Sequence, residues 1–284
     1  MDFREAVLAA IAGPMQRYRQ KMTRDLSDWQ PIEDAAELLL QGKDMPDDEL
    51  HPDFRPLVKM MRLIRDLTAQ SAWDWGHPEV QKTFLEVAGG QIFTLFSETV
   101  VDLLISIMQT VPVRTVVEAG TGPGKVTARL CAEMVRCHFE DVALILSDKL
   151  LAIHQTAAAL RSAFPSLSIT DFVWNIREEA DPQLCSLLKP PVLVFERFCL
   201  PYAGHNAIEN ISKIADILLV VDDLSLTGKK ASFDYLYEKI GTQFLIFETA
   251  RQHLEKYFSL VHACDMETVK ATRSPVTTFT IAIK

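Results

Sequence analysis

The sequence has little glycine, little basic charge and no paired-cysteine motif. Only 11 of its 284 residues are glycine and five are cysteine, and 29 lysines and arginines stand against 38 acidic residues, which leaves a net charge of −9. The hydrophobic fraction of 48% and the charged fraction of 24% are ordinary for a globular protein. These values exclude a disordered or fibrous chain.

The shortage of basic residues argues against nucleic acid as a partner. Residues 1–110 carry a net charge of −7 and residues 111–284 a net charge of −2. Neither segment has the excess of lysine and arginine that a phosphate-binding surface usually needs.

The cysteines and histidines show none of the spacings typical of a metal site, and we expect no metal. An odd number of cysteines without a Cys-x-x-Cys pair favours free thiols in a cytoplasmic protein. The N-terminal residues mix charged with apolar side chains, unlike a signal peptide. The most apolar stretch, 91–108, includes Glu98 and Asp102. We therefore expect a buried helix there and no membrane segment.

Hydrophobic periodicity divides the chain near residue 110. Residues 1–110 carry apolar side chains at helical spacing, interrupted by proline and glycine, and predict an all-helical domain. Residues 111–284 alternate short β-branched runs with amphipathic segments, which favours a parallel sheet covered by helices on both faces. The expected strands are 113–119, 142–147, 168–173, 192–197 and 216–222, then 258–266 and 277–284, which we expect to pair antiparallel. The expected helices among them are 125–137, 149–163, 180–188, 205–214, 229–240 and 251–258.

Three of the 11 glycines, Gly120, Gly122 and Gly124, lie in one turn between the first strand and the next helix. Glycine permits a tight turn and lets a ligand approach bare backbone. The helix that follows offers unpaired N–H groups and the positive end of its dipole. Such a turn after the first strand of an α/β sheet is where ligands bind. The spacing GxGxG matches neither the dinucleotide fingerprint nor a P-loop.

The segment VVEAGTGPGK, residues 116–125, resembles the first motif of class I S-adenosylmethionine-dependent methyltransferases. The resemblance covers about residues 113–284 and implies an α/β fold: a Rossmann-like, doubly wound, mostly parallel seven-stranded sheet with an antiparallel final strand. It also implies that residues 1–110 form a helical lid or substrate domain, that residues 111–284 form the cofactor domain, and that the cofactor is S-adenosyl-L-methionine. The residues that the resemblance assigns to the cofactor are Glu118, Gly120, Thr121, Gly122 and Gly124 on the turn, Asp148 for the ribose, Trp174 and Asn175 for the adenine, and Glu196 at the end of the fourth strand.

Asp148 also has a purely structural interpretation, as the N-cap of the helix that follows. Trp174 is equally well explained as a core aromatic residue. Both alternatives stay open on the sequence alone.

His205 follows the fourth expected strand, and Asp222 and Asp223 end the fifth. Methylation of a hydroxyl or carbon acid needs a general base, and a carboxylate can orient a histidine for that task. This arrangement resembles the methyltransferase domains embedded in polyketide synthases. We therefore expect His205 to be the base, with Asp222 or Asp223 as its partner.

The helical domain has two features relevant to a substrate. Its aromatic residues could line an apolar pocket over the sheet, although packing in a helix core explains each one as well. Basic residues recur on one helical face and would suit an acidic carrier protein, although a solvated face explains them too. The aromatic residues are Trp73, Trp75, Phe84, Phe93 and Phe96; the basic residues are Lys59, Arg62 and Arg65.

The expected function is methyl transfer to a hydroxyl or activated carbon of a small or carrier-bound metabolite. An RNA or protein methyltransferase is an alternative, but the net acidity and the absence of an NPPY or DPPY motif after the fourth strand disfavour RNA. A catalytically degenerate methyltransferase fold that serves as a binding subunit is another. A homo-oligomer is compatible with the sequence.

Overall fold

The computed structural model describes residues 2–26 and 28–284. A seven-stranded sheet has the order β3-β2-β1-β4-β5-β7-β6. Strands β1 to β5 are parallel, and β7 runs antiparallel to both of its neighbours, β5 and β6. The strand order reverses between β1 and β4, so the crevice between these strands is the topological switch point. The strands are β1 Thr115–Ala119, β2 Ala143–Asp148, β3 Ile169–Val173, β4 Val192–Arg197, β5 Ile217–Ser225, β6 Leu260–Ala263 and β7 Val276–Ile283.

Helices cover both faces of the sheet, as the near-continuous apolar strands predicted. One face packs against α1, α5, α6 and α7, and the other against α8, α10 and α12. The doubly wound architecture and the antiparallel last strand are therefore confirmed. The bounds are α1 Phe3–Asp25, α5 Gln91–Thr110, α6 Lys125–Arg136, α7 Ile153–Ala163, α8 Pro182–Leu187, α10 His205–Ile214 and α12 Phe247–Leu254.

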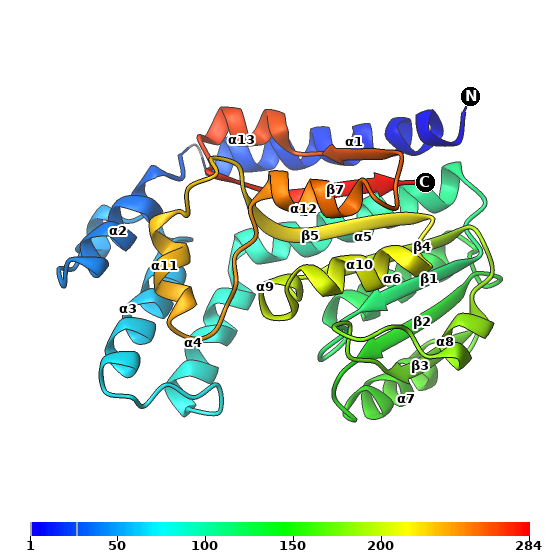
Figure 1. The fold of residues 1–284 in the computed structure, drawn as a ribbon, viewed down its shortest axis with the longest axis horizontal. Coiled ribbons are helices and arrows are strands. Elements are labelled where there is room, and N and C mark those ends of the chain that lie inside the picture. The colour runs from blue at the N-terminus through cyan, green and yellow to red at the C-terminus, as the bar shows by residue number, and fades with distance from the viewer. Residues whose placement is uncertain (1, 27) are drawn as a thin grey trace.

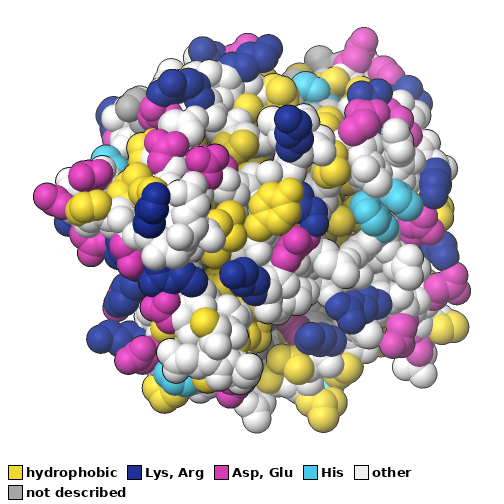
Figure 2. Space-filling model, turned by 60° about the vertical axis from the view of Figure 1, so that its left-hand side comes forward, with side chains coloured by type: hydrophobic (Ala, Val, Ile, Leu, Met, Phe, Trp, Pro, Cys, Tyr) yellow, Lys and Arg dark blue, Asp and Glu magenta, His cyan; other side chains and the backbone are white. Residues whose placement is uncertain are grey.

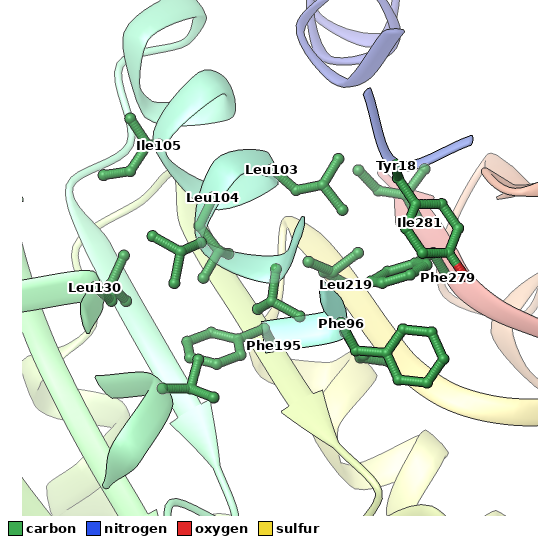
Figure 3. Packing of buried hydrophobic residues seen from close by; sticks show 14 of the residues in the cluster. Tyr18, Phe96, Leu103, Leu104, Ile105, Leu130, Phe195, Leu219, Phe279 and Ile281 are labelled. Atoms are coloured by element: carbon green, nitrogen blue, oxygen red, sulfur yellow. The ribbon is translucent and has the colours of Figure 1, made fainter. Parts of the chain in front are cut away.

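Helix α5 lies in the core between α1 and the sheet. Leu103 and Leu104 are fully buried, and Phe96 packs against Phe279 of β7 with ring centroids 6.0 Å apart. Figure 3 shows these side chains together with Tyr18 of α1, whose ring meets Phe279 edge-on at 5.1 Å. This helix is long and apolar enough to cross a membrane, but 61% of its apolar window is buried inside the protein. Its apolar face is therefore explained by core packing.

A proline in the middle of α1 is accommodated by α5. Pro14 has no N–H, so the carbonyl of Ala10, one turn earlier, loses its helical partner. The Ser106 hydroxyl of α5 donates to that carbonyl at 2.6 Å. The contact joins the two helices at the point where α1 would otherwise expose an unsatisfied acceptor.

A second group of helices stands at the carboxyl ends of the parallel strands. It consists of α2, α3, α4 and α11, and these four helices lie together on the left of Figure 1. We call this group the lid. Helix α11 comes from the second half of the chain and packs on α2 and α3, so the lid draws on both halves. The domain boundary at residue 110 stays a prediction. The bounds are α2 Gln30–Leu40, the short 3₁₀ helix η1 Asp47–Glu49, α3 Arg55–Ala69, α4 Pro78–Gly89, α9 Leu200–Ala203 and α11 Ser232–Glu238.

Two short helices after residue 110, α9 and α13, were not predicted. Helix α13, Met266–Thr272, joins β6 to β7 and lies beside α1 (Figure 1). The sequence left little room for it, and two closing strands were expected to follow each other directly. The helix is short and is stabilised by packing on α1, so the local pattern carried no clear signal.

Candidate active site at the carboxyl edge of the sheet

The glycine turn leaves β1 at Ala119 and enters α6 at Lys125, as predicted. Gly120, Gly122 and Gly124 have φ angles of +81°, +55° and +71°. L-residues rarely adopt these values, so the turn needs glycine at each position. The backbone N–H groups of residues 120 and 121 both donate to the carbonyl of Ser147, at 2.8 and 2.9 Å. This pair of bonds fixes the turn to the end of β2.

The three glycines meet different surroundings. A Cβ on Gly120 would lie 2.1 Å from the Cys199 sulfur, and one on Gly124 would lie 2.7 Å from a methyl of Thr156. A Cβ on Gly122 would have no atom within 4 Å. The first and third glycines therefore allow close packing within the protein, whereas the second leaves bare backbone open to a ligand.

Thr121 places a buried hydroxyl in this turn. Its side chain is 6% exposed, and its hydroxyl lies close enough to the Glu118 carboxyl to oppose the rise in the pKa of that group. The open backbone at Gly122 beside this hydroxyl fits the adenosyl cofactor that the motif implies.

Asp148 ends β2 and turns toward the glycine turn. Its carboxylate accepts from the Gly122 N–H at 2.9 Å and from the Leu150 N–H at 3.0 Å. Because α7 begins only at Ile153, Asp148 does not cap that helix. Two exposed leucines, Leu150 and Leu151, follow it directly. The structure thus brings the predicted ribose ligand beside the turn, with an apolar surface next to it.

The polar groups of Trp174 and Asn175, which follow β3, form hydrogen bonds within their own loop. Trp174 is 5% exposed and packs in the core, and its indole N–H donates to the Glu178 carbonyl at 3.1 Å. The Asn175 amide donates to the Glu178 side chain, and its oxygen accepts from the Arg177 N–H. For Trp174 the core packing is therefore observed, and adenine contacts by either residue stay a prediction.

Glu118 lies under the turn and is 4% exposed. The Thr127 hydroxyl of α6 donates to its carboxylate. Burial raises the pKa of Glu118 to about 7, while the Thr127 hydrogen bond and the charge of Arg197 oppose the rise. Near neutral pH this carboxyl can therefore gain or lose a proton when a charged group arrives.

Two further carboxylates join β4 to β5. Glu196 is fully buried and accepts from the N–H groups of Cys199 and Val221, at 3.2 and 3.0 Å. Asp222 is 2% exposed and accepts from the Leu200 N–H at 3.2 Å. Burial raises the pKa of Glu196 to about 7 and that of Asp222 well above its ordinary value. Both side chains hold the loop after β4 in place, and a cofactor contact by Glu196 stays a prediction.

The predicted pairing of His205 with Asp222 or Asp223 is not present. The His205 ring stacks on His253 of α12, with centroids 4.5 Å apart and planes 16° apart. Asp223 instead accepts from the Thr278 hydroxyl of β7 at 2.9 Å, and burial raises its pKa to about 6. The reason is geometric, because His205 opens α10 and faces α12, whereas the two aspartates point into the loop after β4 and into β7.

His205 itself retains features of a base. Its Nδ1 is buried without a partner. Burial lowers its pKa, and the neighbouring His253 lowers it further, while Glu209 acts in the opposite direction. Glu209 lies 2.9 Å from His253 Nδ1, so it supports the stacked pair through the second ring. The ring is therefore neutral at pH 7 and able to accept a proton.

Sequence reasoning missed three consecutive residues after Glu196. Arg197 donates to the Ser97 hydroxyl of α5 at 2.9 Å. Phe198 has a φ of +54° and packs on Phe93 and Phe96 of α5. Positive φ in a bulky residue is a genuine outlier and is often found at functional sites. Cys199 fills the space over the first glycine of the turn.

Aromatic side chains connect the lid to the loop that follows β4 at the carboxyl edge of the sheet. Trp75, in the loop between α3 and α4, meets Tyr202 of α9 edge-on at 6.1 Å and Phe84 of α4 at 6.2 Å. The Arg177 guanidinium, in the loop after β3, donates to the Tyr202 carbonyl. Tyr202 therefore contacts both Trp75 and the loop after β3.

The basic side chains expected to form one face of α3 are neutralised. Lys59 pairs with Glu86, and Arg62 and Arg65 both pair with Asp44. Figure 2, which views the molecule with the lid side forward, shows acidic and basic side chains mixed over this surface. These residues therefore do not form a free basic patch.

Within the part of the chain that the structure describes, no group of three His, Cys, Asp or Glu side chains could hold a metal ion. Cavities of about 520 and 250 Å³ lie along α1 and α5, and neither contains a residue of the glycine turn.

No protein-family model matches the sequence, and no curated protein matches it. Solved structures do share the fold. The CMeT domain of the citrinin polyketide synthase aligns with a TM-score of 0.63 at 14% identity, over 100% of this chain and 89% of that domain. The carbon methyltransferase DszA aligns with a TM-score of 0.62 at 12% identity, over 98% of this chain and 87% of its own. The carbon methyltransferase CurJ aligns with a TM-score of 0.57 at 12% identity, over 89% of this chain and 70% of its own. The chain therefore has the fold of class I S-adenosylmethionine-dependent methyltransferases, including the helical region before the sheet.

Proposed function

We propose that the protein is a methyltransferase that uses S-adenosyl-L-methionine. The observation that carries this proposal is the glycine turn at the switch point, where Gly122 leaves its backbone open beside the carboxylate of Asp148. When bound, the cofactor supplies a methyl group activated by a sulfonium sulfur. Gly120, Gly122 and Gly124 would shape the turn that receives it, and Asp148, beside the turn, would bind the ribose hydroxyls.

The acceptor in this proposal is a hydroxyl or activated carbon of a small or carrier-bound metabolite. The fold is shared with the CMeT domain of the citrinin polyketide synthase and with the carbon methyltransferase DszA, which supports carbon as the acceptor atom. The net charge of −9 suits such a substrate better than a polyanion. The aromatic side chains of Trp75, Phe93 and Phe198 at the lid contact suit an apolar acceptor.

His205 is the proposed general base. As the bond from the acceptor atom to the methyl carbon forms and the carbon–sulfur bond breaks, His205 would take the proton that the acceptor loses. A neutral imidazole with an unpartnered Nδ1 is suited to this step. Glu209 would stabilise the resulting positive charge through His253.

Calorimetry with S-adenosylhomocysteine tests the cofactor assignment directly. Folded wild-type protein should bind it in the micromolar range typical of such ligands, and Gly122→Val, which blocks the open backbone, should not. The exposed Gly42, which also has positive φ and open space, provides the matched Gly42→Val control. Failure of the wild-type protein to bind would refute the cofactor. Binding without turnover on hydroxyl or carbon acceptors would instead indicate a degenerate binding subunit.

A further inference from the structure

Two histidines from separate helices form a stacked pair. His205 is the first residue of α10, and His253 lies in the last turn of α12, which packs beside α10 (Figure 1). Their ring centroids are 4.5 Å apart and their planes differ by 16°. The N–H groups of an imidazole lie in the plane of its ring. Rings that are nearly parallel are therefore linked by packing and charge, and not by a hydrogen bond.

A carboxylate pairs with the second ring of this stack. Glu209 stands one turn after His205 on α10, and its carboxylate lies 2.9 Å from His253 Nδ1 and 3.0 Å from the Lys256 ammonium group. The Nδ1 atom of His205 is buried and has no partner among residues 2–26 and 28–284. The charged and titratable groups that act on His205 are Glu209 on its own helix, His253 on α12 and Lys256 just after α12.

This environment disfavours a positive charge on His205. Burial lowers its pKa and His253 lowers it further, whereas Glu209 acts in the opposite direction and Lys256 adds to the lowering. His205 also lies at the positive end of the α10 dipole, which disfavours a cation. Two imidazoles in contact cannot both take up a proton without repulsion, so each ring opposes protonation of the other. A carboxylate in direct contact with His205 would instead favour its charged form.

We propose that His253 is a positioning residue for His205: it holds the His205 ring by stacking and opposes its protonation, while Glu209 anchors the His253 ring. This inference rests on the proposed function, in which His205 is the general base. A second histidine thus stands where the sequence suggested an acidic partner. The consequence is a base that stays neutral, and can therefore accept a proton, to a lower pH than an ordinary histidine.

NMR titration of the histidine Cε1–H signals tests this proposal without cofactor or substrate. His205→Gln identifies the His205 signal by its loss. His253→Phe keeps an aromatic ring in the stack and removes the second titrating group. The titration midpoint of His205 should therefore rise, by about 0.5 to 1 pH unit. In the double variant His253→Phe/Glu209→Gln it should fall again, because the carboxylate that favours the charged form is lost as well.

His154→Phe is the matched control. His154 lies in the first turn of α7 and pairs with Asp171 of β3, so the same substitution removes a carboxylate-paired histidine elsewhere. It should leave the His205 midpoint unchanged. If His253→Phe does not fold, as judged by its thermal transition, His253→Gln decides, because it also removes the charge and should also raise the midpoint.

A His205 midpoint that does not move in the folded His253 variant, or that rises equally in His154→Phe, would overturn the role of His253. Failure of folded wild-type protein to bind S-adenosylhomocysteine in calorimetry would instead refute the proposed function. Because the titrations need no cofactor, the two failures are distinguishable.

Discussion

Of the three glycines in the turn, Gly120 has the least space for a side chain. Its replacement by alanine should lower the free energy of unfolding through two separable effects. The φ of +81° is unfavourable for an L-residue. In addition, the new Cβ would lie 2.1 Å from the sulfur of Cys199 and 3.4 Å from its Cβ. Gly122→Ala carries the first cost without the second, because its φ is +55° and no atom lies within 4 Å of the new Cβ.

The magnitudes of these costs follow from their causes. A left-handed backbone costs an L-residue about 1–2 kcal/mol. Overpacking against the Cys199 sulfur adds about 1–3 kcal/mol, since the side chain must rotate or the turn must shift. Gly120→Ala should therefore lower the free energy of unfolding by about 2–5 kcal/mol, a large part of the roughly 5–15 kcal/mol of a typical domain. Gly122→Ala should cost about 1–2 kcal/mol.

Urea unfolding of Gly120→Ala, Cys199→Ala and the double variant tests this reasoning. Cys199→Ala removes the sulfur and leaves only the Cβ contact at 3.4 Å. The double variant should therefore recover the packing cost, which gives a favourable coupling energy of about 1–3 kcal/mol, and should retain the backbone cost. Equal destabilisation by Gly120→Ala and Gly122→Ala, or the absence of coupling to Cys199, would refute the proposed clash.

Four other outcomes are expected. Asp148→Asn should weaken S-adenosylhomocysteine and adenosine alike, by about 10- to 100-fold in calorimetry, because the charge that would bind the ribose is lost; an effect on only one of them would contradict the ribose role. His205→Ala should retain cofactor binding and lose most turnover, and in the wild-type protein kcat/KM should fall as the pH drops below the lowered pKa of this histidine, because the base becomes protonated. Trp75→Ala should speed both association and dissociation of S-adenosylhomocysteine in stopped-flow measurements if the Trp75–Tyr202 contact limits access to the glycine turn, because that contact is lost; unchanged rates would mean that it does not limit access. If Glu118 contacts the cofactor as the motif implies, the affinity for S-adenosylhomocysteine should fall as the pH drops below about 7, because this carboxyl, with its pKa of about 7, then loses its negative charge; Glu118→Gln should bind more weakly and without this pH dependence.

Strands and turns were predictable because their signals are local. The apolar runs predicted β4 at 192–197 without error, and β1, β2 and β3 within one or two residues at each end. The helix opened by His205 was also correct. The predictions were less accurate for elements that depend on distant contacts. Helix α12 occupies 247–254 where 251–258 was expected, and α13 was missed. Strand β5 continues to Ser225 through an irregularity between Val221 and Leu224, and no local pattern of apolar residues marks such a feature.

In the candidate site, too, the positions of residues along the chain were predictable, whereas the directions of their side chains were not. Parallel strands bring their carboxyl ends to one edge, so the sequence could place Asp148 and the glycine turn together. It could not show which way the first turn of α10 faces, and in the structure His205 lies against His253 rather than against the two expected aspartates. Arg197 is the instructive omission, because a signal for it existed. Leu193 and Phe195 are buried on the α5 face, and the period of two places Arg197 on that face as well. A charge that continues a buried register at the end of a strand is a signal that the sequence alone offers, and in the structure the guanidinium donates to Ser97 of α5 and lies near the Glu118 carboxylate.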